Sequence, residues 1–308
     1  LALGAIWKSS NGSSDIHKNI SLAIVGAIAG GLFYIRFVFE IQPSVLLLAN
    51  AILISGFCAL LGQTVSRQSS AVYAGIMIVL GLSLGVILNE TILSRCFLCG
   101  LLGYIANSLK KKEIKTFRSK VINFQITLAI IFSIGSTFMV DTIQVFVGLL
   151  LALTFLPLPP FHLVFVRTIK DAKGTLPSFL VVVWILIGLN ELQDVYASLT
   201  TETLFALSLL AISAAVYATL VALVQKVNSL FVASVTLAHT ALIWGVLYLL
   251  PNYSKWGIPF GVILAFVIAG ITLNFSFIQQ RYGLKTIGNL PGLLKAMPRC
   301  GLVLVLLV

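Results

Sequence analysis

A proline cluster beside a histidine is the part of this sequence best suited to ion chemistry. Residues 153–189 begin as an apolar helix, are interrupted by Pro157, Pro159 and Pro160, and then resume as a second apolar helix. Proline lacks a backbone N–H and clashes with the preceding turn, so a helix cannot run straight through this cluster. A bilayer tolerates such a break only where protein or a water-filled cavity satisfies the freed backbone groups. His162, directly after the break, therefore marks a candidate proton or ion path.

Few other side chains could carry protons. His239 lies in an apolar segment, and the histidine pKa near neutrality suits proton transfer, although a lone histidine in such a helix more often has a structural hydrogen bond. Glu90, at the start of an apolar run, is a third candidate. One run ends in polar residues that could hydrate a path but that we expect at the membrane surface, because Asp194 follows and the run ends there: Asn190, Glu191 and Gln193.

Metal and enzyme chemistry have little support. Cys96 and Cys99 form a CxxC pair inside an apolar helix, with no second pair or clustered histidine. We therefore expect buried, small cysteine side chains and no metal site. Three histidines and scattered acids form no catalytic set, so we predict no catalytic residue and no cofactor.

Composition makes the chain an integral membrane protein. Of its 308 residues 59% are hydrophobic and 9% charged, with a mean hydropathy of +1.08, whereas a soluble domain has about 25% charged residues. A membrane helix needs about 20 apolar residues. Runs of this kind span residues 20–39, 43–62, 71–89, 91–107, 121–139, 142–158, 178–198, 202–225, 230–250 and 257–280, and another opens near 300.

Basic residues divide the loops between two sides. If the runs alternate across the membrane, seventeen of the twenty Lys and Arg lie on the side of the 108–120 loop, while Arg36 and Arg95 lie within runs. The positive-inside rule makes this the cytoplasmic side, so the net charge of +11 needs no nucleic acid partner. We interpret the chain as a piece of a longer protein. It would have a cytoplasmic-side segment over residues 1–19, one transmembrane domain over residues 20–308 that is incomplete at its C-terminus, and a broken-helix loop over residues 157–177.

Three sequence blocks occur together in the order and spacing of a known family. The first reads LPLPPFH over 156–162, with PSFL at 177–180. The second reads ALVQK over 222–226, with ASVTLAH at 233–239, and the third reads GNLPGLLKAMP over 288–298. Together they resemble the antiporter-like membrane subunits of respiratory complex I, Mrp-type cation/proton antiporters and membrane-bound hydrogenases.

The resemblance covers roughly residues 85–308. It implies an all-α, polytopic membrane helix bundle built from inverted repeats, each with a discontinuous helix. This chain would supply about 10–11 transmembrane helices and the first discontinuous helix.

The same resemblance implies a proton path through buried charges, which are costly and therefore functional. The path uses a lysine in the broken helix and a lysine or histidine in the next helix. The first lysine position is Phe155 here, and the second falls near Leu186 or Ile187. Most of the implied relay is thus replaced by apolar residues.

The path also uses a glutamate in an earlier helix. One alignment places it at Glu90, and the alignment that we favour places it at Cys99 or Gly100. His162 and His239 remain at their family positions.

We therefore expect an antiporter-like subunit of a multi-subunit proton- or cation-translocating complex of the NADH–quinone oxidoreductase or Mrp type. Its role would be structural or coupling, with reduced proton translocation and, in an oxidoreductase, no catalysis of its own. Expected partners are other membrane subunits, the lipid bilayer, and protons or Na⁺. The alternative is a stand-alone secondary transporter of ions or small solutes, which should carry buried polar residues near the midplane. A bacterial inner membrane and an organellar inner or thylakoid membrane both fit.

Overall fold

A computed structural model describes residues 14–38, 42–64, 69–89, 92–110, 117–138, 141–249 and 253–283, with the single positions 286, 298, 301 and 302. The described part forms eleven α-helices and confirms the predicted all-α bundle. They are α2 (Ser14–Val38), α3 (Pro43–Gly62), α4 (Ser69–Ile87), α5 (Ile92–Lys110), α6 (Phe117–Gly135), α7 (Asp141–Phe155), α8 (Leu163–Asp171), α9 (Leu176–Tyr196), α10 (Thr201–Val224), α11 (Asn228–Leu247) and α12 (Ile258–Tyr282). A short π-helix, η1 (Tyr253–Gly257), precedes α12.

The helices follow the apolar runs of the sequence. Eight of the described helices are long and apolar enough to cross a membrane, and α6 and α7 are shorter apolar helices. The chain is therefore an integral, multi-pass membrane protein. Nearly all of the run that opens near residue 300 lies outside the described residues.

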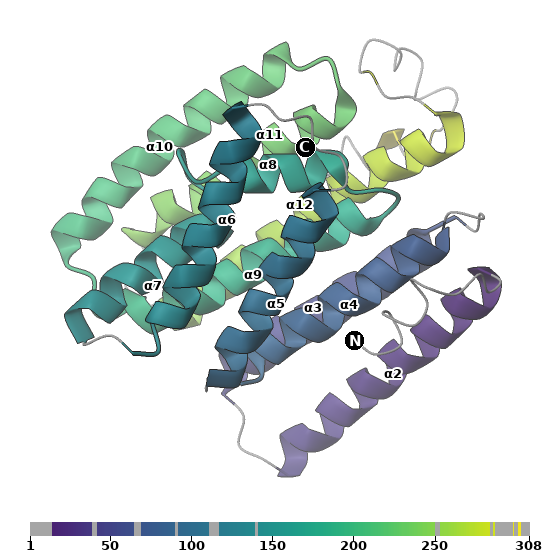
Figure 1. The fold of residues 1–308 in the computed structure, drawn as a ribbon, viewed down its shortest axis with the longest axis horizontal. Coiled ribbons are helices and arrows are strands. Elements are labelled where there is room, and N and C mark those ends of the chain that lie inside the picture. Colours follow the sequence, from purple (N-terminus) through teal and green to yellow (C-terminus); the bar gives the residue numbers. More distant parts are fainter. Residues whose placement is uncertain are drawn as a thin grey trace.

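Helix α9 forms the centre of the bundle (Figure 1). It contacts α3, α4, α7, α8 and α12, and most of its residues are buried. By contrast α2 and α10 lie at opposite edges (Figure 1), and most of their residues are not buried. A helix that is apolar on all faces suits the central position, because every face meets another helix.

Contacts between helix ends define two ends of the bundle. At one end Thr64 Oγ1 donates to Gln280 Oε1 at 2.7 Å. At the other end Gln193 Nε2 donates to Ser44 Oγ at 3.2 Å. We call the first the basic end, because it carries Lys170, Lys173, Lys226 and Arg281. We call the second the far end; it carries Asn89, Glu191, Asp194 and Glu202.

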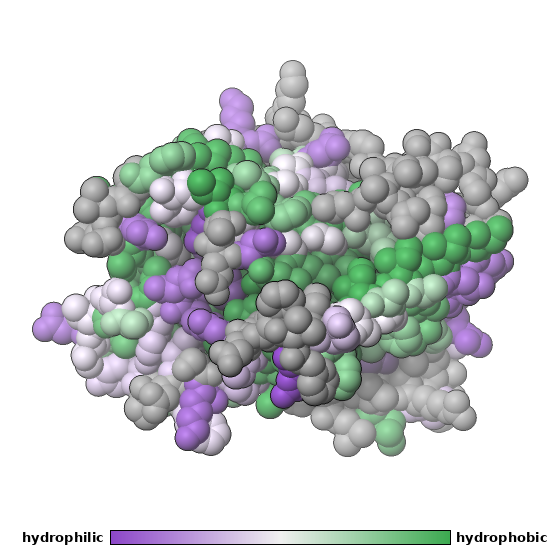
Figure 2. Space-filling view, turned by 90° about the horizontal axis from the view of Figure 1, so that it is seen from below, coloured by the Kyte–Doolittle hydropathy of each residue, from purple (hydrophilic) through white to green (hydrophobic). Residues whose placement is uncertain are grey.

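The outer surface of the bundle is apolar. Large side chains such as Phe146, Ile212 and Leu223 are exposed on it, and Figure 2 shows patches of hydrophobic residues among hydrophilic ones on one face. The buried side of α10 is instead made of small residues, namely Ser208, Ala211, Ala214, Ala218 and Ala222. Small residues let helix backbones approach closely in a membrane, which explains the tight pairing of α10 with α11.

Candidate functional site

The predicted helix break is present. Helix α7 ends at Phe155 and α8 begins at Leu163. In an uninterrupted helix the Leu156 carbonyl would accept from the N–H of residue 160, but Pro160 has none. Trp244 of α11 replaces that donor, with its indole Nε1 at 3.0 Å from the Leu156 carbonyl oxygen.

Two more side chains from other helices donate to carbonyls around the break. Trp184 Nε1 of α9 donates to the Thr154 carbonyl at 3.1 Å. Gln125 Nε2 of α6 donates to the Pro160 carbonyl at 2.8 Å. A break in a membrane helix needs such partners, and at these three carbonyls the partners are protein side chains.

Replacing Trp244 with phenylalanine is expected to lower the apparent melting temperature of the full chain in detergent. The substitution leaves the buried Leu156 carbonyl without a donor, which costs about 1–3 kcal/mol. Thermal unfolding followed by circular dichroism at a fixed heating rate measures the effect. Trp256 is 55% exposed, so Trp256→Phe is the control and should change stability by less than about 0.5 kcal/mol. Equal effects of the two substitutions would show that the indole donor does not hold the break.

The centre of the bundle beside the break is apolar and closed. Phe155 is fully buried, and its ring centroid lies 5.6 Å from that of Trp184. Trp184 in turn packs against Phe165 at 5.7 Å. Leu186 and Ile187 are also fully buried. The positions at which the family resemblance implies lysines are therefore packed with hydrocarbon.

The loop between α8 and α9 is anchored to α3. Thr175, at the start of α9, donates hydrogen bonds to the end of α3 through both its backbone N–H and its hydroxyl. Its backbone N–H donates to Gln63 Oε1 at 3.0 Å, and its hydroxyl donates to the Ala59 carbonyl at 2.7 Å. Gly174 has φ of +61°, a left-handed conformation that favours glycine. This turn fixes where α9 begins.

The structure places the two candidate histidines on elements that contact each other, α8 and α11. His162 flanks the start of α8, is half-buried, and has its ring 6.2 Å from that of Tyr217. His239 Nδ1 lies 2.8 Å from the Val235 carbonyl oxygen of its own helix, the contact of a structural histidine. Neither histidine lines the two polar pockets described below. Glu90 lies outside the described residues.

Glu191 lies near the far end of α9 but is buried in the protein and does not face solvent. The residue is 1% exposed, and its Oε2 lies 2.5 Å from Arg95 Nη1 of α5. Arg95 Nη2 is also 3.9 Å from Asp194 Oδ2, on a side chain that is exposed. A buried carboxylate is tolerated when a charged partner compensates it, and Arg95 provides that partner from a neighbouring helix.

A polar pocket of about 400 Å³ surrounds this ion pair at the far end. Asn89, Ser94 and Gln193 line it with the pair. Among the described residues, Glu191 Oε1 has no hydrogen-bond donor. Glu191 Oε1 can therefore accept a hydrogen bond from water or a ligand in the pocket. The pocket does not extend along α9, whose residues 179–189 are apolar and buried.

Arg95 is the residue that sequence reasoning missed as a partner. It lies in the first turn of α5, and Glu191 lies in the last two turns of α9. With alternating helix directions these positions have similar depth in the membrane. Two opposite charges at similar depth inside apolar runs could therefore have predicted this ion pair from the sequence.

Tyr253 closes the far end beside this pocket. Its hydroxyl donates to the Leu189 carbonyl at 2.9 Å, and its ring stacks on Tyr196 at 4.9 Å. Burial, with the nearby charge of Asp194, raises the pKa of Tyr253 well above its ordinary value. The hydroxyl therefore remains a hydrogen-bond donor at neutral pH.

The expectation of a buried cysteine is wrong at Cys96, which is exposed, and Cys99 is half-buried. Cys58 is exposed as well. The apolar runs that contain them have lipid-facing sides, so a cysteine in such a run need not point into the protein.

Comparison with protein-family models and with curated proteins found no match to this chain. The family resemblance therefore depends on the three sequence blocks. The first forms the helix break, and the second spans the end of α10 and part of α11. Nearly all of the third lies outside the described residues.

Proposed function

We propose that this chain is an antiporter-like membrane subunit of a multi-subunit proton- or cation-translocating complex, with a structural or coupling role and little or no proton translocation of its own. The observation that carries the proposal is the closed apolar centre beside a retained helix break. Phe155, Trp184 and Leu186 are each fully buried there. A proton path through this point would need polar groups or water.

The way in which the break is stabilised supports the same proposal. Tryptophan indoles pair with the Thr154 and Leu156 carbonyls. Those bonds occupy carbonyl groups that an ion or water would otherwise contact. The discontinuous helix thus serves as a scaffold in this chain.

The proposed complex is of the NADH–quinone oxidoreductase or Mrp type, and the chain would add no catalysis to it. Its partners would be other membrane subunits. The basic end would face the cytoplasm, or the equivalent compartment of an organelle, because basic loops are retained on that side.

The full chain, reconstituted alone into liposomes with an internal pH-sensitive dye, is expected to give no proton flux above that of protein-free liposomes. A K⁺ diffusion potential supplies the driving force, and a protonophore added at the end verifies the dye response. His162→Ala and His239→Ala should leave the result unchanged, because neither residue lines the far-end pocket or the pocket at the basic end of the bundle. A flux that either substitution abolishes would contradict the proposal.

Blue native electrophoresis of membranes that contain the tagged full chain tests the assembly. We expect the chain in a complex much larger than its own 33.2 kDa. NADH oxidation activity in the same band would indicate the oxidoreductase type, and its absence the Mrp type.

A stand-alone transporter is the second candidate, and the far-end pocket with its buried Glu191 is the observation that favours it. It predicts migration as a single chain and a flux of ions that Glu191→Gln abolishes. Those two results together would replace the proposal with this alternative.

A further inference from the structure

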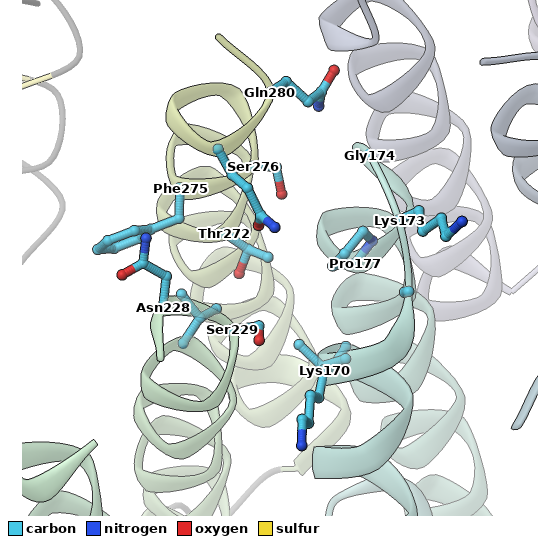
Figure 3. A pocket seen from close by; sticks show the side chains of 14 residues that line it. Lys170, Lys173, Gly174, Pro177, Asn228, Ser229, Thr272, Phe275, Ser276 and Gln280 are labelled. Carbon is cyan, nitrogen blue, oxygen red and sulfur yellow. The ribbon is translucent and has the colours of Figure 1, made fainter. Parts of the chain in front are cut away.

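A second pocket lies at the basic end, between α8, α9, α11 and α12 (Figure 3). Its volume is about 270 Å³. Lys170 and Lys173 lie on one side, and Ser229 and Ser276 lie on the other (Figure 3). Because α9 and α11 begin here and α12 ends here, the pocket lies at the level of a membrane surface.

The charge that lines this pocket is positive. Lys170 and Lys173 are among the lining residues, and no described aspartate or glutamate is. Both lysines are exposed, and within the described part of the chain neither ammonium has a hydrogen bond or an ion pair. The adjacent Asp171 has its ion pair with Arg167, whose Nε lies 2.6 Å from Asp171 Oδ2. In Figure 3 the two side chains point away from each other, but both are exposed and can turn toward an anion bound at the pocket.

Ser276 is an independent indication of a ligand. It is 7% exposed and lines the pocket, and its hydroxyl has no hydrogen bond to any described residue. Other buried hydroxyls of these helices bond their own helix: Thr272 donates to the Ile268 carbonyl at 2.8 Å, and Ser234 to the Leu230 carbonyl at 2.9 Å. The Ser276 hydroxyl therefore remains available to donate to a ligand in the pocket that it lines.

Gln280 and the start of α11 add further donors to the lining of the pocket. Gln280 Oε1 accepts from Thr64, but Gln280 Nε2 is buried and has no partner among the described residues. Ser229 lies in the first turn of α11, whose N-cap residue, Val227, provides no side-chain cap. The first-turn N–H groups and the helix dipole of α11 favour a negative ligand at this position.

We propose that this pocket binds a phosphate group, carried by an anionic phospholipid headgroup or by a soluble phosphate. Phosphate oxygens accept from ammonium groups, hydroxyls and helix N-termini alike. The volume of about 270 Å³ lies just below the range for drug-sized ligands, which suits a headgroup. Ile169, Val232 and Phe275 add apolar walls on which the glycerol end of a lipid can lie. The site does not depend on the proposed function.

The test measures binding of short-chain phosphatidylglycerol, short-chain phosphatidylcholine and inorganic phosphate to the full chain in detergent, by native mass spectrometry. In Lys170→Gln/Lys173→Gln the affinity for phosphatidylglycerol should fall about tenfold or more, because two charge-assisted hydrogen bonds are lost. The control is Lys226→Gln/Arg281→Gln. It removes two charges from the same end but none from the pocket lining, and should lower the affinity about threefold or less.

A variant that lacks one hydroxyl distinguishes binding in this pocket from nonspecific attraction of the lipid to positive charge. Ser276→Ala should weaken phosphatidylglycerol binding about threefold or more. Ser208→Ala, which removes a hydroxyl bonded to the Phe205 carbonyl of its own helix, should not. Circular dichroism verifies that each variant is folded.

The three probes distinguish the sources of the phosphate. Competition by inorganic phosphate at concentrations similar to those of the lipid indicates a soluble phosphate ligand. Binding of phosphatidylglycerol without such competition indicates a headgroup. Equal binding of phosphatidylcholine and phosphatidylglycerol, or equal losses in the pocket and control double variants, would overturn the proposal.

Discussion

Glu191→Gln is expected to destabilise the full chain by about 3 kcal/mol, since removal of one partner of a buried ion pair leaves the other charge uncompensated. Of the described residues, only Asp194, at 3.9 Å and on an exposed side chain, would remain as an ion-pair partner of Arg95. The side chain of Arg95 is 20% exposed, so water screens part of the loss and the value lies at the low end of the usual range. Thermal unfolding in detergent, followed by circular dichroism, measures the change.

Two further variants test whether the loss of stability comes from the uncompensated charge of Arg95. Glu202→Gln removes an exposed carboxylate from the same end of the bundle and should cost less than about 1 kcal/mol. The double variant Arg95→Met/Glu191→Leu replaces the pair with apolar groups and should recover most of the stability lost in Glu191→Gln. If Glu191→Gln costs no more than Glu202→Gln, the pair does not hold α5 against α9.

The position of this pair bears on the family resemblance. Arg95 lies four residues from Cys99, and Glu191 lies four residues from Ile187. Both separations are about one helical turn. In each helix the charged residue lies nearer the far end than the other residue of the pair. Cys99 or Gly100 is the position at which the favoured alignment implies a glutamate, and Leu186 or Ile187 is the position at which the resemblance implies a lysine or histidine. The chain thus carries its buried charges one turn nearer the far end and with opposite signs, which agrees with the proposal that the implied relay is not used.

The sequence was sufficient to predict the helices and the break. Membrane helices depend on a local property, the apolar run, and each run through residue 280 corresponds to a helix. The break between Phe155 and Leu163 also has a local cause, because Pro157, Pro159 and Pro160 cannot continue a helix.

The partners of the break could not be predicted in the same way. Trp184 and Trp244 lie 30 and 88 residues from the carbonyls to which they donate, and no local pattern identifies a donor across such a separation. The burial of Glu191 has the same origin, because it depends on Arg95, 96 residues away. The exposure of Cys58 could not be predicted either, because an apolar run does not reveal which of its sides faces lipid.

Gly188→Ala is expected to destabilise the full chain by about 3 kcal/mol, the upper part of the range for an overpacked core. A Cβ at this position would lie 2.8 Å from the backbone nitrogen of Leu156 and 2.9 Å from the carbonyl carbon of Phe155. These are backbone atoms at the end of α7, so the clash cannot be relieved by a side-chain rotation. The end of α7 would have to move away from α9, which also strains the bond from Trp184 to the Thr154 carbonyl.

Gly245→Ala is the matched control, with the opposite expected sign. A Cβ at Gly245 of α11 would have no neighbour within 4 Å. Alanine there should stabilise the chain by about 0.5–1 kcal/mol, because glycine has the larger entropy cost in a helix. The two variants differ only in what the added methyl group meets, so the difference between their melting temperatures reports the close approach of α7 to α9. A rise in both would show that the broken helix does not contact α9 at this glycine, and the closed apolar centre would lose its structural basis.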